Sequence, residues 1–505
     1  MKRILSILLL LIILLTGCQA GGGAGQKPAA CVHTDVDENG FCDKCEISVV
    51  VVVDLYTLND LHGKFADTVL QPGVDELTTY LKTMKAVDDH VVLLSSGDMW
   101  QGSPESNNTK GQIVTDWMND LDFAAMTVGN HEYDWGEEFV ENNADAAEFP
   151  FLGINIYERK TNERVDYAEA SVMVTCGDAK IGIIGAIGDC YSSIAPEQVE
   201  DIYFKTGSEL TRLVKAEADR LREAGADFIV YSIHDGYGQS SSGTQDVTAG
   251  RISSYYDIAL SNGYVDLVFE AHSHQKYVLR DRHGVYHLQN GGENQGLSHV
   301  EVAINHVTDT STVNTAEFVP TSAYTTLADD PIVSNLLNKY EDDIAQAMDV
   351  LGTNGVYRTG NQLKQTVANL YYKVGVERWG KQYDIALGGG FITVRSPYDL
   401  MRGEVTYGTL QMLFPFDNQL VLCSIKGSDL YARFFRTNNS NYYIAYGDYG
   451  RELKNNIDPD ATYYVVVDTY SASYAPNRLT VVDRYDEGVY ARDLLADYVK
   501  AGGLE

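Results

Sequence analysis

The stretch Thr127-Val128-Gly129-Asn130-His131-Glu132-Tyr133-Asp134 indicates both the fold and the chemistry of this chain. It follows the apolar run Phe123 to Met126, so it is typical of the polar end of a buried strand, where α/β proteins place their functional groups. Asn130 offers a carbonyl oxygen to a metal, whereas His131 projects in a different direction. Asp134 can reach back to the imidazole of His131 and favour its protonated form. The alternative is a turn in which Asn and Gly adopt unusual dihedral angles.

The same pattern, an apolar run that ends in a polar cluster, recurs along residues 49–275. Helix-like segments, such as Asp75 to Lys85 and Leu210 to Ala224, lie between the runs. We therefore expect an α/β fold of layered sheets in which the polar clusters converge on one edge. The apolar runs are Val49 to Leu58, Val91 to Leu94, Phe123 to Met126, Phe228 to Ile233 and Val265 to Phe269.

The polar clusters predict a pair of metal ions. Asp60 and His62 are separated by one residue, so in an extended segment both side chains point the same way and can bind one ion. Asp98 has two carboxylate oxygens and can bridge two ions. Two divalent ions about 3.5 to 4 Å apart can clamp a phosphoryl group for in-line attack by water. We expect Asp60, His62, Asp98 and His274 to hold one ion, and Asp98, Asn130, His234 and His272 to hold the other.

His131, kept protonated by Asp134, is the expected proton donor to the leaving group. All eleven histidines lie at or before His306, which favours a histidine-built site in one part of the chain. The net charge of −33 excludes a nucleic-acid polymer or an anionic lipid surface as the main partner, because neutralising phosphates requires clustered Lys and Arg. Small phosphorylated substrates stay compatible with this charge, since bound cations invert the local field.

The N-terminus predicts export. Lys2 and Arg3 precede an apolar run from Ile4 to Leu15, which is shorter than the roughly 20 residues of a membrane-spanning helix. The run and Leu15-Thr16-Gly17-Cys18 resemble a bacterial lipoprotein signal, which implies cleavage before Cys18 and a lipid on its thiol. An ordinary signal peptide with a chance cysteine is the alternative. We expect the body at the extracellular face of a bacterial membrane, or on the periplasmic side, attached only through this lipid.

Residues 31–45 contain a small cluster whose chemistry the sequence leaves open. Cys31, His33, Cys42 and Cys45 could form a zinc site. The alternation of Asp35, Asp37 and Asn39 resembles the start of a calcium loop. Export would also allow a disulfide between two of the cysteines.

The ordered motifs of the first half resemble the calcineurin-like metallophosphoesterases, and in detail the secreted 5′-nucleotidases. The resemblance is carried by Thr57-Leu58-Asn59-Asp60-Leu61-His62-Gly63 and Gly129-Asn130-His131-Glu132-Tyr133-Asp134-Trp135-Gly136. It implies a four-layer core of two sheets flanked by helices, the two ligand sets given above, and a catalytic pair of His131 and Asp134. Ala271 stands where the family usually has Gly, a small change that we expect to be tolerated.

The C-terminal part resembles the nucleotidase substrate-binding domain through residues 385–391 and 406–418. The resemblance implies substrate contacts from Arg358, Gly389, Gly390, Arg395 and the stacking residue Phe416. The sequence departs from the family at Gly388, where Asn is usual, and at Thr393, where Arg is usual. The usual Gly-Asp-Gly segment is missing, so Tyr474, or alternatively Tyr470, is the second stacking candidate.

These observations give one expected organisation and one expected function. The domains are a signal peptide (1–17), a tether with the cysteine cluster (18–47), a catalytic domain (48–325), a connecting helix (326–352), and an α+β substrate-binding domain (353–505). Apolar residues at helical spacing place the connecting helix at Asp329 to Val350, although an ordinary core helix would have the same spacing. The expected activity is two-metal hydrolysis of 5′-nucleotides, with 2′,3′-cyclic nucleotides as further substrates and Zn, Mn or Fe as the metals. Alternatives are a nucleotide-binding or partner-binding lipoprotein with a vestigial metal site, or hydrolysis of another phosphate or sulfur-oxyanion ester.

Overall fold

The computed structural model describes residues 34–36, 40–44, 48–67, 72–236, 264–281, 283–395, 397–436, 440–473 and 478–505 of the 505-residue chain. Two compact units are recognised: a small one of residues 1–50 with 306–308, and a large one that contains the rest. Among the described residues, none of the helices combines the length and the apolar character needed to cross a bilayer.

Two six-stranded sheets form the core of the N-terminal half of the large unit. The first has the order β14-β13-β1-β2-β3-β4, with β1 to β4 parallel, and the second the order β11-β12-β10-β9-β7-β6, with β7, β9, β10 and β12 parallel. The first sheet comprises β1 (Val50–Leu58), β2 (Val91–Ser95), β3 (Ala125–Thr127), β4 (Phe151–Leu152), β13 (Gly296–Asn305) and β14 (Thr310–Pro320). The second comprises β6 (Ser171–Cys176), β7 (Ala179–Ile187), β9 (Phe228–His234), β10 (Leu267–Phe269), β11 (Lys276–Arg280) and β12 (Tyr286–Asn290).

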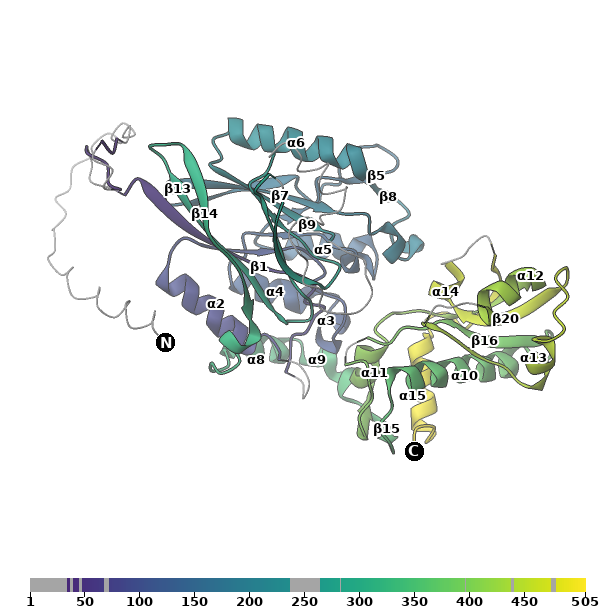
Figure 1. Ribbon diagram of the computed structural model, residues 1–505. Helices are drawn as coiled ribbons and strands as arrows, with labels where there is room; N and C mark the ends of the chain where they lie inside the picture. The colour runs from purple at the N-terminus through teal and green to yellow at the C-terminus, as the bar shows by residue number, and fades with distance from the viewer. Residues whose placement is uncertain are drawn as a thin grey trace. The chain divides into compact units, whose positions relative to one another are not determined.

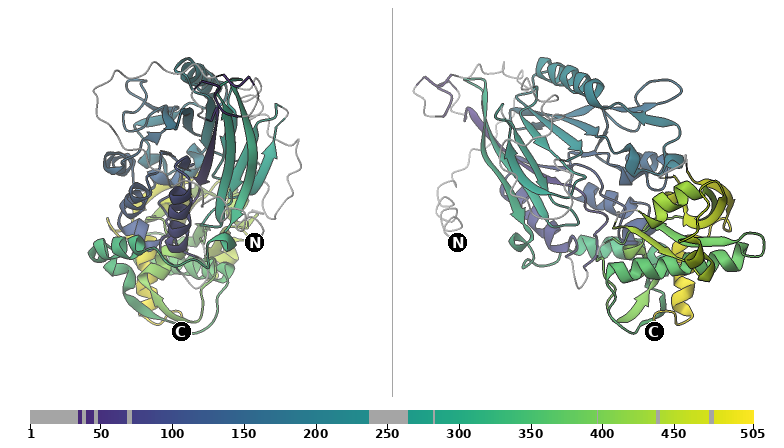
Figure 2. Two further views of the ribbon diagram at one scale, coloured as in Figure 1. Left: turned by 90° about the vertical axis from the view of Figure 1, so that its left-hand side faces the viewer. Right: turned by 45° about the vertical axis from the view of Figure 1, so that its right-hand side comes forward.

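The two sheets pack face to face and helices cover their outer faces (Figures 1 and 2). Between the sheets, side chains such as Leu55 and Leu94 meet Ile183 and Val230 in one apolar cluster. Helix α6 (Gly207–Glu223) covers the second sheet, while α2 (Asp75–Val87), α4 (Gln112–Asp120) and α5 (Glu137–Ala146) cover the first. The expected four-layer α/β core is confirmed, and α2 and α6 occupy the two segments expected to be helical.

Helix α6 shows how the sequence selects these layers. Its buried residues Leu210, Val214, Ala218 and Leu221 recur every three or four positions, so they form one apolar stripe. Most residues between them are polar, and most of these polar residues are exposed. The stripe packs against Ile184, Ile229 and other residues on the outer face of the second sheet.

The segment expected to form one helix from Asp329 to Val350 is divided, so that prediction is wrong in detail. It forms α8 (Pro331–Lys339), α9 (Glu341–Ile344) and a 3-10 turn, η5 (Ala345–Met348), before β15 (Val350–Asn354) begins. Helix α8 starts at Pro331 because Asp330 caps the amide of Ile332. It stops at Tyr340, whose hydroxyl donates a hydrogen bond to Asp116 on α4.

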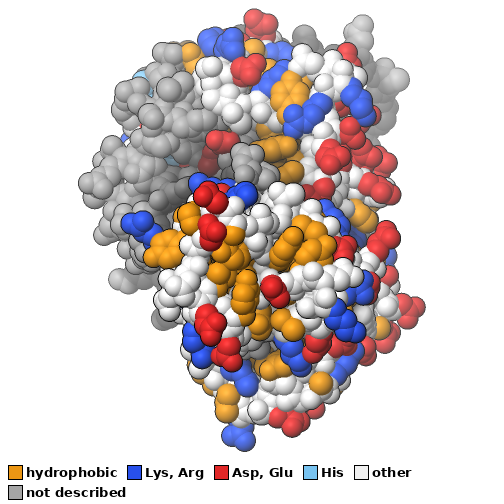
Figure 3. All heavy atoms as spheres, turned by 90° about the vertical axis from the view of Figure 1, so that its right-hand side faces the viewer, with side chains coloured by type: hydrophobic (Ala, Val, Ile, Leu, Met, Phe, Trp, Pro, Cys, Tyr) orange, Lys and Arg blue, Asp and Glu red, His pale blue; other side chains and the backbone are white. Residues whose placement is uncertain are grey.

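The C-terminal half is built on a mixed five-stranded sheet of order β19-β16-β20-β18-β21. Helices α10 (Gly360–Trp379) and α15 (Ala491–Lys500) pack against one face of the sheet, together with α11 (Tyr407–Leu413). On the face drawn in Figure 3, basic side chains are scattered among acidic ones. The strands are β16 (Ile385–Phe391), β18 (Leu420–Lys426), β19 (Tyr442–Ala445), β20 (Thr462–Asp468) and β21 (Thr480–Arg484); α13 (Asp448–Leu453) and α14 (Thr469–Ser473) follow β19 and β20.

The small unit includes part of the cysteine cluster. The amide of Gly40 donates to the Asp35 carboxylate at 2.9 Å, and Cys42 is buried. Cys18, Cys31, His33 and Cys45 lie outside the described residues. The lipid attachment and the choice between metal and disulfide therefore stay predictions.

Candidate metal centre and active site

The carboxyl ends of the central parallel strands carry most of the predicted ligands. Asp60, Asp98 and Asn130 follow the ends of β1, β2 and β3 by two or three residues, His234 is the last residue of β9, and His272 follows β10. Neighbouring strands end level with one another, since Leu58 pairs with Ser95 and Ser232 pairs with Phe269. The two stacked sheets therefore deliver these side chains to one edge.

The residues predicted to hold the first ion are Asp60, His62, Asp98 and His274, and the structure brings these side chains together. The Nε2 atoms of His62 and His274 face each other at 3.1 Å, and Nε2 of His274 lies 3.4 Å from Oδ1 of Asp60. The possible ligand atoms of Asp60, His62 and His274 all lie within 4.8 Å of one another. A carboxylate oxygen of Asp98 lies within the same distance of His62.

The residues predicted to hold the second ion are Asp98, Asn130, His234 and His272, and these also lie together. Nε2 of His234 lies 3.1 Å from Oδ2 of Asp98 and 3.2 Å from Oδ1 of Asn130. The ring of His272 stands against that of His234, with 5.3 Å between centroids. Asp60, Asp98 and His234 also offer ligand atoms within 4.8 Å of one another, so the two positions adjoin through the aspartates.

The donor set fits divalent ions. Nδ1 of His62 and Nδ1 of His234 each lie 2.8 Å from a backbone carbonyl oxygen, that of Gln101 and that of Ser96, so their Nε2 lone pairs face the cluster. Burial and the adjacent His274 lower the pKa of His62, which keeps its imidazole neutral as a metal ligand must be. Nδ2 of Asn130 is buried with no partner among the described residues, an orientation that commits the carbonyl oxygen to the cluster.

The backbone is strained at most of the predicted ligands. The left-handed region costs non-glycine residues free energy of order 1 kcal/mol each, and such residues cluster at functional sites. Five of the seven predicted ligands adopt it, which indicates that the turns are shaped for the side chains they present. The φ values are 51° for Asp60, 51° for His62, 54° for Asp98, 64° for His272 and 51° for His274.

Glu132 holds two of the ligand-bearing loops together, a role that sequence reasoning missed. Its buried carboxylate accepts hydrogen bonds from the amides of Asp98 at 2.9 Å, Met99 at 2.8 Å and Gly129 at 2.7 Å. Burial and the neighbouring Asp98 raise the pKa of Glu132 to about 7. The only signal in the sequence was an acidic residue beside Asn130 and His131, which does not show what it contacts.

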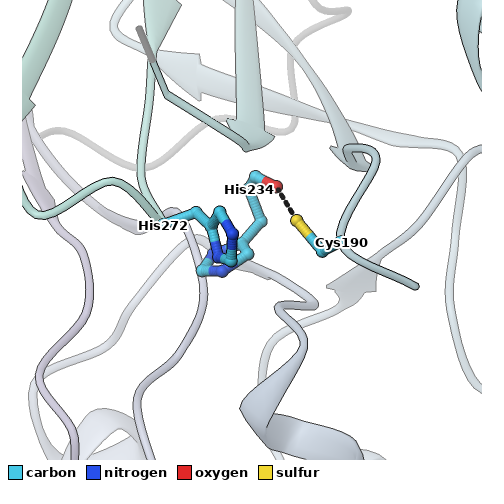
Figure 4. A group of neighbouring side chains, drawn as sticks. All are labelled: Cys190, His234 and His272. Carbon is cyan, nitrogen blue, oxygen red and sulfur yellow. Dashed lines mark hydrogen bonds between the residues drawn. The ribbon is translucent and has the colours of Figure 1, made fainter. Parts of the chain in front are cut away.

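Cys190 contacts the end of β9 through the backbone of His234. Its buried thiol donates a hydrogen bond to the carbonyl oxygen of His234, with 3.3 Å between sulfur and oxygen (Figure 4). The sulfur and ring nitrogens of His234 and His272 lie within 4.8 Å of one another. Burial raises the pKa of this thiol well above its usual value, so it remains protonated and fits this hydrogen bond.

His131 and Asp134 form the contact expected from their spacing. Nδ1 of His131 lies 2.7 Å from Oδ2 of Asp134, and both side chains are about nine-tenths buried. Burial opposes a charge on the ring, but the carboxylates of Asp134 and Asp98 together raise the pKa of His131 above its usual value. Nε2 of His131 faces away from Asp134, 3.1 Å from Nη2 of Arg395. The pair therefore presents a ring nitrogen toward the basic side chain that follows β16.

A cavity of about 310 Å³ opens beside these residues. At one end it is lined by Asp98, Asn130 and His131, and its walls also come from β16, α10, α15 and the segment 414–418. A cavity of this size that combines aromatic walls with a few polar groups is typical of a small-molecule site. The aromatic lining residues are Trp135, Tyr371, Phe391, Phe414, Phe416 and Tyr470.

Two of the predicted substrate-binding residues line this cavity. The guanidinium of Arg395 lies over the ring of Phe416, 5.6 Å from its centroid, and Phe416 stacks beside His131 with 5.9 Å between centroids. Tyr470 also lines the cavity, whereas Tyr474 lies outside the described residues.

The structure does not bring Arg358, Gly389 or Gly390 to the cavity. The guanidinium of Arg358 instead donates to the carbonyl oxygen of Leu504 at 2.9 Å and to the side chain of Asn354. The two glycines let neighbouring segments approach β16: a Cβ on Gly389 would lie 2.1 Å from a backbone oxygen of β19, and one on Gly390 would lie 2.6 Å from the hydroxyl of Ser471 on α14. Arg358 thus holds the C-terminal residues and the glycines shape β16, and contact of these three residues with the substrate stays a prediction.

The fold and the clustered donors define a metal-dependent hydrolase of phosphoesters. Residues 55–276 match the calcineurin-like phosphoesterase family, and this chain carries a domain of that family. Domains of this family act with divalent metal ions, which agrees with the clustered ligand groups.

Known proteins resemble the chain beyond this domain. The protein UshA of Yersinia enterocolitica is 26% identical over 408 residues, which cover 73% of this chain and 72% of UshA. A 5′-nucleotidase of Vibrio vulnificus is 27% identical over 230 residues, which cover 43% of this chain and 39% of the relative. The crystal structure of a putative 5′-nucleotidase from Staphylococcus aureus superimposes with a TM-score of 0.68 at 18% identity, covering 90% of this chain and 98% of the other. The fold therefore extends through both halves of the chain.

Proposed function

We propose that this chain hydrolyses phosphate esters of nucleotides, with 5′-mononucleotides as the main substrates. The observation that carries the proposal is the joining of two features in one cavity. At one end lie the predicted metal ligands and the His131–Asp134 pair, and the rest of the wall holds aromatic rings that suit a flat base. The names of the 5′-nucleotidase relatives support the same substrate class.

The seven clustered ligands are proposed to hold two divalent ions. When bound, the ions neutralise the phosphoryl oxygens and activate water for in-line attack. Arg395, whose guanidinium lies 3.1 Å from Nε2 of His131, is proposed to bind a phosphoryl oxygen beside that nitrogen. His131 then donates the proton on Nε2 to the departing alkoxide, while Asp134 holds the proton on Nδ1.

The aromatic end of the cavity is proposed to hold the nucleoside. Phe416 and Tyr470 offer ring faces, and stacking on one base is worth roughly 1 to 3 kcal/mol. The carboxylate of Asp468, which is 5% exposed, also lines the cavity. It accepts hydrogen bonds from the amide of Ser471 at 2.7 Å and from the hydroxyl of Tyr371 at 3.4 Å. Its remaining lone pairs are proposed to accept N–H groups of the base.

The same site is proposed to open 2′,3′-cyclic nucleotides, because activated water can attack either type of ester. Residues 48–325 are proposed as the catalytic domain and 353–505 as the substrate-binding domain, joined through 326–352. The leader through Cys18 is proposed to export the chain and to anchor it by a lipid.

The test uses the full-length protein in mild detergent, freed of metal and reloaded with manganese or zinc. AMP, 2′,3′-cyclic AMP and bis-p-nitrophenyl phosphate are the substrates, and released phosphate or nitrophenol is measured. Asp98→Asn should abolish turnover and lower the bound metal, because Asp98 adjoins both positions. His131→Ala should slow turnover of AMP and leave the bound metal nearly unchanged. Binding of AMP by the reloaded wild type without any hydrolysis would replace this proposal with a nucleotide-binding protein.

A further inference from the structure

Three hydroxyl groups lie between the two sheets directly beneath the metal ligands. Oγ of Ser232 on β9 is 2.7 Å from Oγ1 of Thr127 on β3 and 3.0 Å from Oγ of Ser96, which follows β2. All three residues are at most 1% exposed. We call Ser96, Thr127 and Ser232 the hydroxyl bridge, because they connect the first sheet to the second.

The bridge differs from most of the interface between the sheets. Most of that interface is formed by apolar side chains such as Leu55 and Val230, whose packing is not directional. A second polar contact joins β12 to β1, where Nδ2 of Asn290 donates to the carbonyl oxygen of Thr57 at 3.0 Å. A buried hydroxyl, in contrast, destabilises the fold if it has no partner, so the bridge favours one relative placement of the sheets. The bridge therefore favours one register of the two sheets at the ends of β2, β3 and β9.

Each arm of the bridge leads within a few residues to a ligand of the second metal position. Thr127 precedes Asn130 by three residues, and Ser232 precedes His234 by two. Ser96 precedes Asp98 by two, and its own carbonyl oxygen lies 2.8 Å from Nδ1 of His234. Asp98 and Asn130 come from the first sheet and His234 from the second, so their separations of 3.1 and 3.2 Å depend on how the sheets are placed.

We propose that the hydroxyl bridge positions the second metal site by fixing the distance between ligands that come from different sheets. Metal–ligand distances must hold to about 0.2 Å, a tolerance that directed hydrogen bonds can enforce. The bridge residues do not touch the metal or the substrate; they act through Asp98, Asn130 and His234. The inference rests on the two-ion site of the proposed function.

The chain offers a closely matched pair of variants for the test. Thr127→Val removes the hydroxyl that crosses between sheets and keeps the shape of the side chain. Thr57→Val is the control: Thr57 is equally buried and precedes Asp60 by three residues, but its hydroxyl donates to the carbonyl oxygen of Leu94 at 3.3 Å, within the first sheet. Both variants remove one buried hydroxyl next to the ligands, and only one of them disturbs the connection between sheets.

The measurement is the binding of Mn²⁺ to the metal-free full-length protein, by competition with a chromogenic chelator and without substrate. Thr127→Val should weaken one of the two ions about tenfold, the usual effect of losing a group that orients metal ligands, and leave the other within about twofold. The electron paramagnetic resonance signal of the Mn²⁺ pair should change with it. Thr57→Val should keep both affinities and the signal. Ser232→Ala provides a second removal of the bridge, and Ser232→Thr should retain wild-type binding better than Ser232→Ala.

Equal affinities in Thr127→Val and Thr57→Val, at comparable melting temperatures, would overturn the inference, because both hydroxyls would then contribute only to stability. Equal weakening of both ions by Thr127→Val would also overturn it. Since no substrate is present, these results are independent of whether the wild type hydrolyses nucleotides.

Discussion

Replacing Asp134 by Asn tests how His131 works, because it removes a charge and keeps the shape. Oδ2 of Asp134 lies 2.7 Å from Nδ1 of His131, and the two side chains are only 12% and 11% exposed. At an effective dielectric constant of about 20, two unit charges about 4 Å apart interact by about 4 kcal/mol. Each 1.36 kcal/mol corresponds to a factor of ten in rate, so the loss is bounded at about 1000-fold. We expect kcat for AMP to fall about 100- to 1000-fold, within the range for general acid catalysis.

The assay compares two leaving groups under saturating metal. The alkoxide released from AMP requires a proton, whereas p-nitrophenolate leaves readily without one. Asp134→Asn should therefore slow AMP hydrolysis far more than p-nitrophenyl phosphate hydrolysis, with unchanged bound metal. Because the carboxylate of Asp134 raises the pKa of His131, its removal lowers that pKa. The falling limb of kcat at high pH should move to lower pH, since a general acid acts only while protonated.

Two outcomes would refute this reasoning. One is an equal loss for AMP and p-nitrophenyl phosphate, which would place the effect of Asp134 outside leaving-group protonation. The other is a double variant, His131→Ala with Asp134→Asn, in which the two losses multiply. Residues that act through one proton should instead show nearly the same loss together as alone.

Four further predictions follow from named contacts. Phe416→Ala should raise KM for AMP about 5- to 100-fold, matching a stacking loss of about 1 to 3 kcal/mol, and leave p-nitrophenyl phosphate hydrolysis nearly unchanged in a steady-state assay. Asp468→Asn should lower kcat/KM for AMP about tenfold more than for purine riboside monophosphate, which lacks the amino group; equal losses would argue against contact with the base. Burial opposes a charge on His287, but Asp281 and Glu270 raise its pKa to about 9 from 6.5. The stabilisation from protonated His287 is complete below about pH 6.5 and is lost as the pH rises through about 9. The free energy of unfolding of the metal-free protein, measured with urea, should therefore fall by up to about 3 kcal/mol over this window. In His287→Gln this pH dependence should be weaker. Treatment with a chelator should abolish activity and lower the melting temperature, and manganese or zinc should restore both, because binding to the folded state alone stabilises it.

Much of the fold could be predicted from local patterns. The period of apolar residues identified α6 and the strands, because a buried strand or one apolar helix face requires that spacing. The continuous helix expected from Asp329 to Val350 failed for a different reason. Its break at Tyr340 depends on a contact with Asp116, more than 200 residues away in sequence, which periodicity does not encode.

The substrate side was less predictable than the metal side. Motif spacing marked the ligands, since ligand type and position along a strand end are local properties. Arg358 and the glycines of β16 matched a family pattern, but a pattern of residue types does not fix where a side chain is directed. In the folded chain, Arg358 donates a hydrogen bond to the carbonyl oxygen of Leu504 near the C-terminus. Asp468, which no sequence motif had indicated, lines the cavity.

The sequence alone determined which chemical groups this protein has and on which strand ends they lie. The tertiary structure decided their distances and their supports. His62 and His274 are 212 residues apart, yet their ring nitrogens lie 3.1 Å from each other. The Glu132 carboxylate and the hydroxyl bridge hold such loops in place through contacts between remote segments. These contacts arise only when the two sheets stack, because burying the apolar faces fixes the sheets against each other and thereby brings their polar ends together.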